Sequence, residues 1–149
     1  MTPAMCLRAT LTAMSGPELI ALGTEAGIEW RLICRAWNGT PINADAHLKL
    51  CAVLGVDPVD GLPRSAGPVG PIHWPSLSAA VRIARFQRKW SLRRASKAAR
   101  VSYSALGRIE RGEIVSIESV LAVCKFLGRH PFEFTSPVSR ESTETRSAA

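Results

Sequence analysis

The sequence contains an internal repeat, because residues 17–58 align with residues 90–131 at a constant offset of 73 positions and without a gap. Nine aligned pairs are identical and three more share apolar character. The identical pairs are Leu19/Leu92, Ala26/Ala99, Arg35/Arg108, Gly39/Gly112, Leu48/Leu121, Cys51/Cys124, Leu54/Leu127, Gly55/Gly128 and Pro58/Pro131, and the apolar pairs are Ile28/Val101, Ile33/Leu106 and Ile42/Val115. Core and turn positions are the ones that a duplicated fold keeps. The repeat therefore predicts two copies of one small domain.

Changes in composition divide the chain into four parts. Residues 61–77 (GLPRSAGPVGPIHWPSL) are dense in proline and glycine, which interrupt helices, so we interpret them as a linker. Residues 136–149 (SPVSRESTETRSAA) are rich in Ser and Thr without apolar periodicity, which is typical of a disordered tail. The two predicted domains occupy residues 1–60 and 78–135.

Each copy is predicted to be helical. In the second copy, residues 78–89 place four apolar side chains near one stripe of a helix: Val81, Ile83, Ala84 and Phe86. Three serines are suitable N-caps for the helices that follow, and two glycines are suitable C-terminal stops. The serines are Ser91, Ser102 and Ser116, and the glycines are Gly112 and Gly128. The expected fold class is all-α.

The net charge of +7 is distributed unevenly along the chain. Residues 1–60 hold four basic and six acidic side chains, whereas residues 61–149 hold fifteen basic and six acidic ones. The two parts therefore carry net charges of −2 and +9. A concentration of basic charge is expected of a protein that binds a polyanion such as nucleic acid, although membranes and acidic proteins attract the same charge.

The second copy has the pattern of a helix-turn-helix, in which the second of two short helices enters the major groove of DNA. The run WSLRRASKAARVSYSALGRIERGE at 90–113, continued by SIESVLAVCKFLGRHP at 116–131, resembles the Xre (Cro/C1-type) regulators of bacteria and phages. The resemblance implies a lambda-repressor-like bundle of five helices that binds DNA. With the degenerate first copy, the chain would hold two such bundles joined by the Pro/Gly linker.

The resemblance also implies roles for particular residues. In that family an arginine of the first helix pairs with a glutamate near the end of the recognition helix, which here implies an ion pair between Arg85 and Glu110. Leu92 stands where many members carry a base-reading Gln, and Arg100 replaces the usual Gly of the turn, which requires another turn conformation or some strain. We therefore expect specificity to depend on the recognition helix, residues 102–111.

Base readout is expected from four residues of this helix: Tyr103, Ser104, Gly107 and Arg108. Arg108 is the foremost of them, because arginine binds guanine O6 and N7 through two hydrogen bonds. Phosphate contacts are expected from helix N-termini and exposed cations. The residues concerned are Ser91, Arg93, Arg94, Lys97, Arg100, Ser102 and Arg111. The alternative is that the whole group is only a solvated basic face.

The first copy is more degenerate. It keeps the turn Ala26-Gly27-Ile28 and the stop at Gly39, but Thr12 and Trp37 stand where the ion pair would be. Its recognition-like helix offers a candidate second reader, formed by Trp30, Arg31 and Arg35. Dimerisation or binding of a protein partner fits this copy equally well. Two half-sites of an operator would be read either by a homodimer or by an intrachain pseudo-dimer.

Other classes of function find little support in the sequence. It contains neither a Gly-x-Ser-x-Gly nucleophile motif nor a phosphate-cradling glycine loop, so we expect no enzyme and no cofactor. His47 and Cys51 lie four residues apart but lack a second pair of ligands, so no metal site is expected. The sequence has no long apolar run, no secretory signal and no Cys-x-x-Cys spacing, which predicts a cytoplasmic, nucleoid-associated protein without a membrane partner.

The sequence thus predicts a sequence-specific transcription regulator, acting as a repressor, whose partner is a double-stranded DNA operator. The alternative is a protein-interaction adaptor or an antitoxin that uses the same helical scaffold to bind a protein. The charge of +9 on the second part favours DNA, because an adaptor has no need of it.

Overall fold

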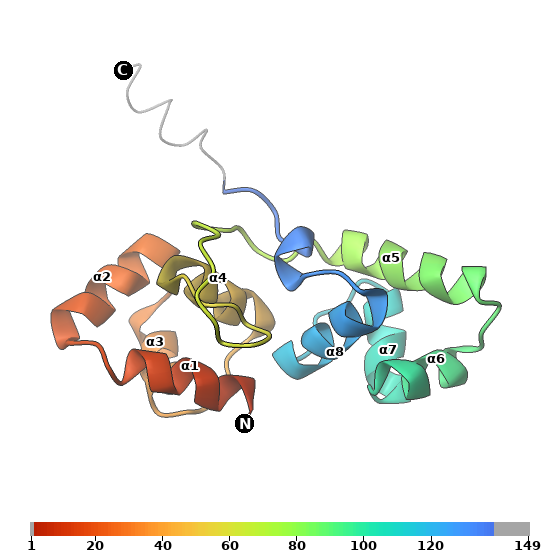
Figure 1. Cartoon of the computed structure of the whole chain (residues 1–149), viewed down its shortest axis with the longest axis horizontal. Helices are drawn as coiled ribbons and strands as arrows, with labels where there is room; N and C mark the ends of the chain where they lie inside the picture. Colours follow the sequence, from red (N-terminus) through yellow and green to blue (C-terminus); the bar gives the residue numbers. More distant parts are fainter. Residues whose placement is uncertain (1, 139–149) are drawn as a thin grey trace, which may run out of the picture.

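The computed structural model of the chain describes residues 2–138, and within them the fold is all-α, as predicted (Figure 1). The elements are α1 (Pro3–Leu11), α2 (Gly16–Ala26), α3 (Trp30–Trp37), α4 (Ala44–Leu54), α5 (Trp74–Gln87), α6 (Leu92–Ala99), α7 (Tyr103–Glu110), α8 (Ile117–Leu127) and the 3-10 helix η1 (Pro131–Phe134). We call α1–α4 the first unit and α5–η1 the second unit. In this part of the chain, no helix is both long enough and apolar enough to cross a bilayer.

The two units share the lengths of their last two α-helices. The first and last residues of α3 and α7 differ by the 73-residue offset of the repeat, and so do those of α4 and α8. The backbone has positive φ at three pairs of positions with the same offset: Gly27/Arg100, Gly39/Gly112 and Gly55/Gly128. The hydrogen bonds that close α4 and α8 also correspond, since Val56 N donates to Cys51 O and Arg129 N donates to Cys124 O, both at 3.0 Å.

Serine side chains fix where three helices of the second unit begin. Ser91, Ser102 and Ser116 each accept a hydrogen bond from the backbone N–H three residues later, at 3.1, 3.0 and 3.3 Å respectively. A cap of this kind stabilises a helix by ~1 kcal/mol, because it satisfies a donor that has no partner within the helix. The caps are at the positions that the sequence predicted.

Helix α4 contributes to two hydrophobic cores. It directs Leu50 and Cys51 into the core of the first unit, and Ala44 and Leu48 into the core of the second. Figure 1 shows α4 and α8 side by side, between α1–α3 on the left and α5–α7 on the right. Leu48 is fully buried, and a leucine buried in this way contributes ~1.5–3 kcal/mol to stability.

Helix α5 begins earlier than the sequence predicted. It starts at Trp74 rather than at residue 78, so the linker is shorter than the predicted segment 61–77. Pro75 fits the first turn, because the first helical residues need no backbone N–H donor.

The buried face of α5 also differs from the predicted stripe. Ile83 and Phe86 are 56% and 58% exposed, whereas Leu77, Val81 and Ala84 are buried. The buried residues follow the i, i+4, i+7 spacing of one helix face. The earlier start of the helix adds Leu77 to this face. Ile83 and Phe86 are six and nine residues after Leu77, which places them on other sides of the helix.

The end of the linker is held against both units. Ile72 is buried, and its N–H donates to Asp45 Oδ1 at the start of α4, at 2.6 Å. Gly70 N donates to Ser136 O at 2.8 Å, and Ser136 N donates to Pro71 O at 2.7 Å. Ser136, predicted as the first residue of the tail, is therefore part of the fold. Residues 139–149 of the predicted tail lie outside the described residues.

Arg100 ends α6 with φ 59° and ψ 39°, a left-handed conformation that costs a residue other than glycine ~1–2 kcal/mol. Gly27 holds the equivalent position in the first unit. Since glycine also gains chain entropy on unfolding, we expect Arg100→Gly to raise the free energy of unfolding by a net ~0.5–1 kcal/mol. Urea denaturation without DNA measures the change.

The matched control for this variant is Lys97→Gly, in the interior of the same helix. It is expected to lower the free energy of unfolding by ~1 kcal/mol, because glycine is a poor helix former. Equal losses in both variants would contradict strain at Arg100.

Candidate nucleic-acid interface

Helices α6 and α7 pack closely because the buried residues of α6 are small. Ala95, Ser96 and Ala99 are buried on α6, opposite Leu106 and Ile109 on α7. The turn between them is only three residues long, and Ser102 caps the start of α7. This pair of helices and its tight turn form a helix-turn-helix, and one side of α7 remains exposed.

The C-terminal end of α7 is fastened to α5 by an ion pair between Arg85 and Glu110. Arg85 Nε and Nη2 donate to the carboxylate, and the shortest contact is 2.8 Å. Arg85 Nη1 donates to Trp90 O at 3.2 Å, and Ser78 Oγ donates to Glu110 O at 2.7 Å. The side chains of Arg85 and Glu110 are 19% and 10% exposed. A pair so poorly exposed contributes more to the position of α7 than to net stability.

Ten of the eleven residues predicted to contact DNA are exposed on α6, on α7 or at their ends. We call them the cationic face: Ser91, Arg93, Arg94, Lys97, Arg100, Ser102, Tyr103, Ser104, Arg108 and Arg111. The set contains six cations and no acid, although Glu113 lies 3.1 Å from Arg111 at its edge. Two helix N-termini, at Ser91 and Ser102, lie within the same set and add partial positive charge.

Aromatic rings hold two arginines of the cationic face. Arg94 Cζ lies 4.8 Å from the ring centroid of Trp90, and Arg93 Cζ lies 5.9 Å from that of Tyr103. Trp90 stacks on Phe126, with 6.2 Å between centroids. Sequence reasoning missed Trp90 and Phe126, and the available signal was a tryptophan directly before the N-cap Ser91. Such cation–π contacts contribute ~0.5–1 kcal/mol each at exposed sites and limit the freedom of the arginines.

Gly107 is the predicted base reader that the structure does not expose. It is buried on α7, and a Cβ added there would lie 3.7 Å from Leu92 Cδ2 and 3.4 Å from Arg111 Nη1. Leu92 itself packs against the core of the second unit. Both separations are ordinary van der Waals contacts. Because Gly107 is buried, it cannot contact a base edge in this arrangement.

Arg108 is exposed but turned toward the loop that follows α7. Its Nη2 donates to Ile114 O at 2.9 Å, and its Nε lies 3.8 Å from Glu113 Oε2. In the first unit the equivalent Arg35 Nη2 donates to the equivalent carbonyl, that of Pro41, at 3.3 Å. The same contact in both units indicates that this arginine fastens the loop.

The geometry therefore moves the candidate base-reading position along α7. Arg108 lies in the last turn and is already hydrogen-bonded, whereas Tyr103 and Ser104 lie in the exposed first turn. Helices that lie in the major groove contact base edges with their N-terminal residues. Tyr103 and Ser104 are thus better placed for readout than Arg108.

The equivalent surface of the first unit lacks the cationic character. Where the second unit has Arg93, Arg94, Lys97 and Arg100, the first has Ile20, Ala21, Thr24 and Gly27. Of the candidate second reader, Trp30 is 52% exposed, and Arg31 lies 3.8 Å from Glu29 at a highly exposed site. Arg35 is occupied by Pro41 O. The structure thus brings these three residues onto α3 without a surrounding patch of cations.

The two buried cysteines, Cys51 and Cys124, and the buried His47 are poor candidates for chemistry. Burial lowers the pKa of His47 to about 4, against the opposing charge of Glu118. Burial raises the pKa of both Cys51 and Cys124 to about 12, so these thiols are protonated at neutral pH. Within residues 2–138, no three His, Cys, Asp or Glu side chains converge as metal ligands.

The comparisons with known proteins agree with this geometry. The model of a family described as Helix-turn-helix matches residues 80–134, which run from α5 to the end of η1 and include the whole cationic face. Neither curated proteins nor solved structures gave a match. The second unit therefore carries a helix-turn-helix similar to that of a known family.

The Arg85–Glu110 pair generates a prediction about stability. Arg85→Met leaves the carboxylate of Glu110 buried without its partner, so we expect the free energy of unfolding to fall by ~3 kcal/mol or more. The double variant Arg85→Met with Glu110→Leu removes both charges and is expected to recover most of that loss. Denaturant unfolding of the variants measures the coupling, and additive losses would show that the pair does not hold α7.

Proposed function

We propose that the chain is a sequence-specific DNA-binding transcription regulator that inserts the first turn of α7 into the major groove. The observation that carries the proposal is the cationic face: six exposed cations and two helix N-termini on the two helices of a helix-turn-helix and at their ends. A duplex presents a dense array of phosphates, and a surface of this charge binds it by releasing counterions.

The parts of the cationic face suit different contacts. The N-terminus of α6 at Ser91, with Arg93 and Arg94 beside it, is suited to phosphates, because backbone N–H groups and cations both bind anions. Tyr103 and Ser104 are suited to base edges through their hydroxyl groups. A regulator that occupies its operator in this way represses transcription by excluding other proteins from the same DNA. We assign that repressor role to the chain.

We also infer that the two units arose by duplication of one helix-turn-helix domain. The equal bounds of α3 and α7 and of α4 and α8 support this inference, as does the shared arginine contact at Arg35 and Arg108. In the inferred duplication the first unit kept the fold and lost the charges that would bind phosphates.

A second candidate function is the binding of a protein partner through the first unit. Trp30 and Ile20 are both more than half exposed on α3 and α2. Trp30 also borders a cavity of about 480 Å³, whose other walls include Leu19, Ile33 and Trp37. Exposed apolar side chains beside a cavity are typical of a protein contact.

The DNA proposal is tested with a binding site selected from random duplexes. Ser104→Ala is expected to weaken binding to the selected site by ~1–3 kcal/mol and to relax the base preference at one position. Arg94→Ala is expected to weaken binding to all sequences alike and to reduce the slope of log K against log salt by ~1. Gel shifts at several salt concentrations measure both effects.

The matched control is Arg82→Ala, an exposed cation on α5 that lies outside the cationic face. It should change neither the salt slope nor the base preference. If Arg94→Ala and Ser104→Ala behave like this control, the regulator proposal is wrong.

The second candidate is tested by co-purification of the tagged chain from the cells that produce it naturally. Trp30→Ala should lose a specific partner and keep the affinity for DNA, since the cationic face is unchanged. Arg94→Ala is the control that should keep the partner. Equal recovery of the same proteins with both variants counts against a docking role for Trp30.

A further inference from the structure

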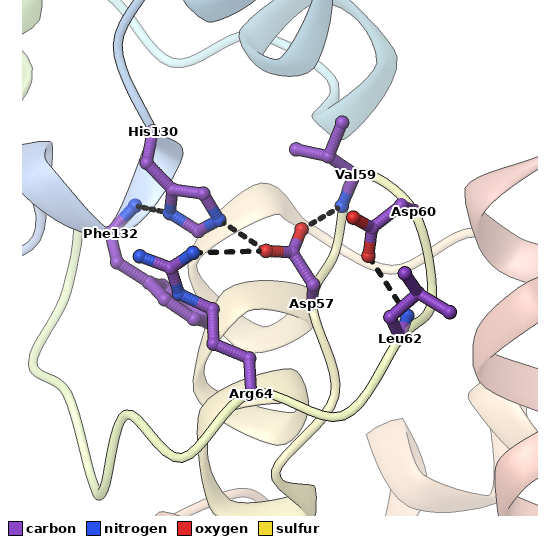
Figure 2. A network of polar contacts seen from close by, with 7 residues as sticks. All are labelled: Asp57, Val59, Asp60, Leu62, Arg64, His130 and Phe132. Atoms are coloured by element: carbon purple, nitrogen blue, oxygen red, sulfur yellow. Dashed lines mark hydrogen bonds and ion pairs between the residues drawn. The ribbon is translucent and has the colours of Figure 1, made fainter.

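The two units contact each other through residues that are equivalent in the repeat. His130 Nε2 and Asp57 Oδ2 are 2.8 Å apart, and their positions in the chain differ by the same 73 residues as α4 and α8 (Figure 2). In an assembly with twofold symmetry, a residue that contacts its own counterpart lies on the symmetry axis. The Asp57–His130 contact is the kind of contact that a pseudo-twofold axis between the units would produce.

Each of the two side chains makes the same second contact within its own unit. Val59 N donates to Asp57 Oδ1 at 2.7 Å, and Phe132 N donates to His130 Nδ1 at 3.1 Å. Val59 and Phe132 are again related by the offset. Because His130 Nδ1 accepts this bond, the ring proton lies on Nε2 and is donated to Asp57.

Apolar residues repeat the relationship beside the polar contact. Ala44 and Leu48 of α4 lie in one core cluster with Ile117, and Leu121 packs against that cluster. Ala44 is equivalent to Ile117 and Leu48 to Leu121, so equivalent positions of α4 and α8 lie in or against one core cluster. A single surface of the repeated unit thus packs against its own copy, as in an isologous dimer interface.

From these contacts we propose that α4 and α8 form an internal dimer interface, so that one chain is a complete pseudo-dimer of helix-turn-helix units and needs no second copy. The proposal rests on the duplication inferred above. Helix-turn-helix proteins that bind DNA as dimers pair through one surface of each copy. In this chain that surface is proposed to lie at α4 and α8, which cover each other. The partner of the chain on DNA is then the duplex alone, bound by one chain.

The linker contacts identify where the symmetry is broken. Arg64 Nη1 lies 3.3 Å from Asp57 Oδ2, and Ile72 N donates to Asp45. Arg64 and Ile72 belong to the linker. The linker connects the two units only once, so it has no counterpart in the repeat. Arg64 therefore adds a cation to one side of a contact that is otherwise shared equally.

The first experiment measures the mass of the full chain by light scattering over a wide range of concentrations, without DNA. We expect 16.1 kDa throughout, and one chain per duplex in the complex with a selected site. A dimer in the free protein, or two chains per duplex, overturns the proposal. The mass of the free protein is measured without DNA. Failure to bind DNA would therefore contradict the regulator proposal but not the internal dimer interface.

The second experiment uses the pseudo-symmetry itself. In an Arg64→Ala background, which removes the asymmetric cation, His130→Asp places two carboxylates opposite each other and should lower the melting temperature by several degrees. Asp57→His alone removes the carboxylate and should also lower it. The double exchange, Asp57→His with His130→Asp, restores one carboxylate and one imidazole in swapped positions.

The double exchange should recover most of the loss in melting temperature, because each position offers its side chain the same backbone N–H. It is compared with the Arg64→Ala parent and with both single variants. If the loss in melting temperature of the double variant equals the sum of the losses of the two single variants, the pseudo-twofold relationship is wrong. If a single variant fails to fold, the mass of the unmodified chain still decides the proposal.

Discussion

The orientation of α7 depends on one carboxylate–guanidinium contact. Arg85 and Glu110 are both largely removed from water. If the two side chains separated, each would leave the other as a buried charge without compensation. Ser78 Oγ also donates to the backbone carbonyl of Glu110, and Arg85 Nη1 donates to the carbonyl of Trp90. Together these bonds restrict the angle of α7 against α5. With α6 and α7 held in this way, the side chains that do not pack in the core are exposed and include those of the cationic face. The site is thus a consequence of how the helix is held.

The sequence predicted those features that depend on local backbone chemistry. The N-caps at Ser91 and Ser102 follow from residue type and position. The ion pair of Arg85 with Glu110 is implied by the resemblance to the Xre regulators rather than by residue spacing. The sequence did not predict that Arg108 would turn to Ile114, because a long side chain has several rotamers and the choice depends on a carbonyl six residues away. Gly107 is buried together with Leu106 and Ile109. The sequence analysis did not predict the burial of Gly107, because glycine has no side chain that would assign it to a face.

Under the proposed duplication, a comparison of the two units indicates which positions the fold constrains. Packing and turn positions repeat, as do the bonds from Arg35 and Arg108 to the loop carbonyls. In both units the arginine donates to a loop carbonyl. The prediction that these arginines contact bases remains a prediction. The exposed positions differ most, since Ile20 replaces Arg93 and Trp30 replaces Tyr103. Exposed residues contribute little to stability, so they are free to change with the partner that each unit binds.

An internal dimer interface gives a physical reason for the unequal charges of −2 and +9 in the two parts of the sequence. In a homodimer both binding surfaces come from one sequence, so every cation gained by one surface is gained by the other. When the two units belong to one chain, the interface at α4 and α8 can be kept while each outer surface changes alone. The cationic surface at Arg94 and the apolar surface at Trp30 can then coexist on one pseudo-symmetric body, which a pair of identical chains could not achieve.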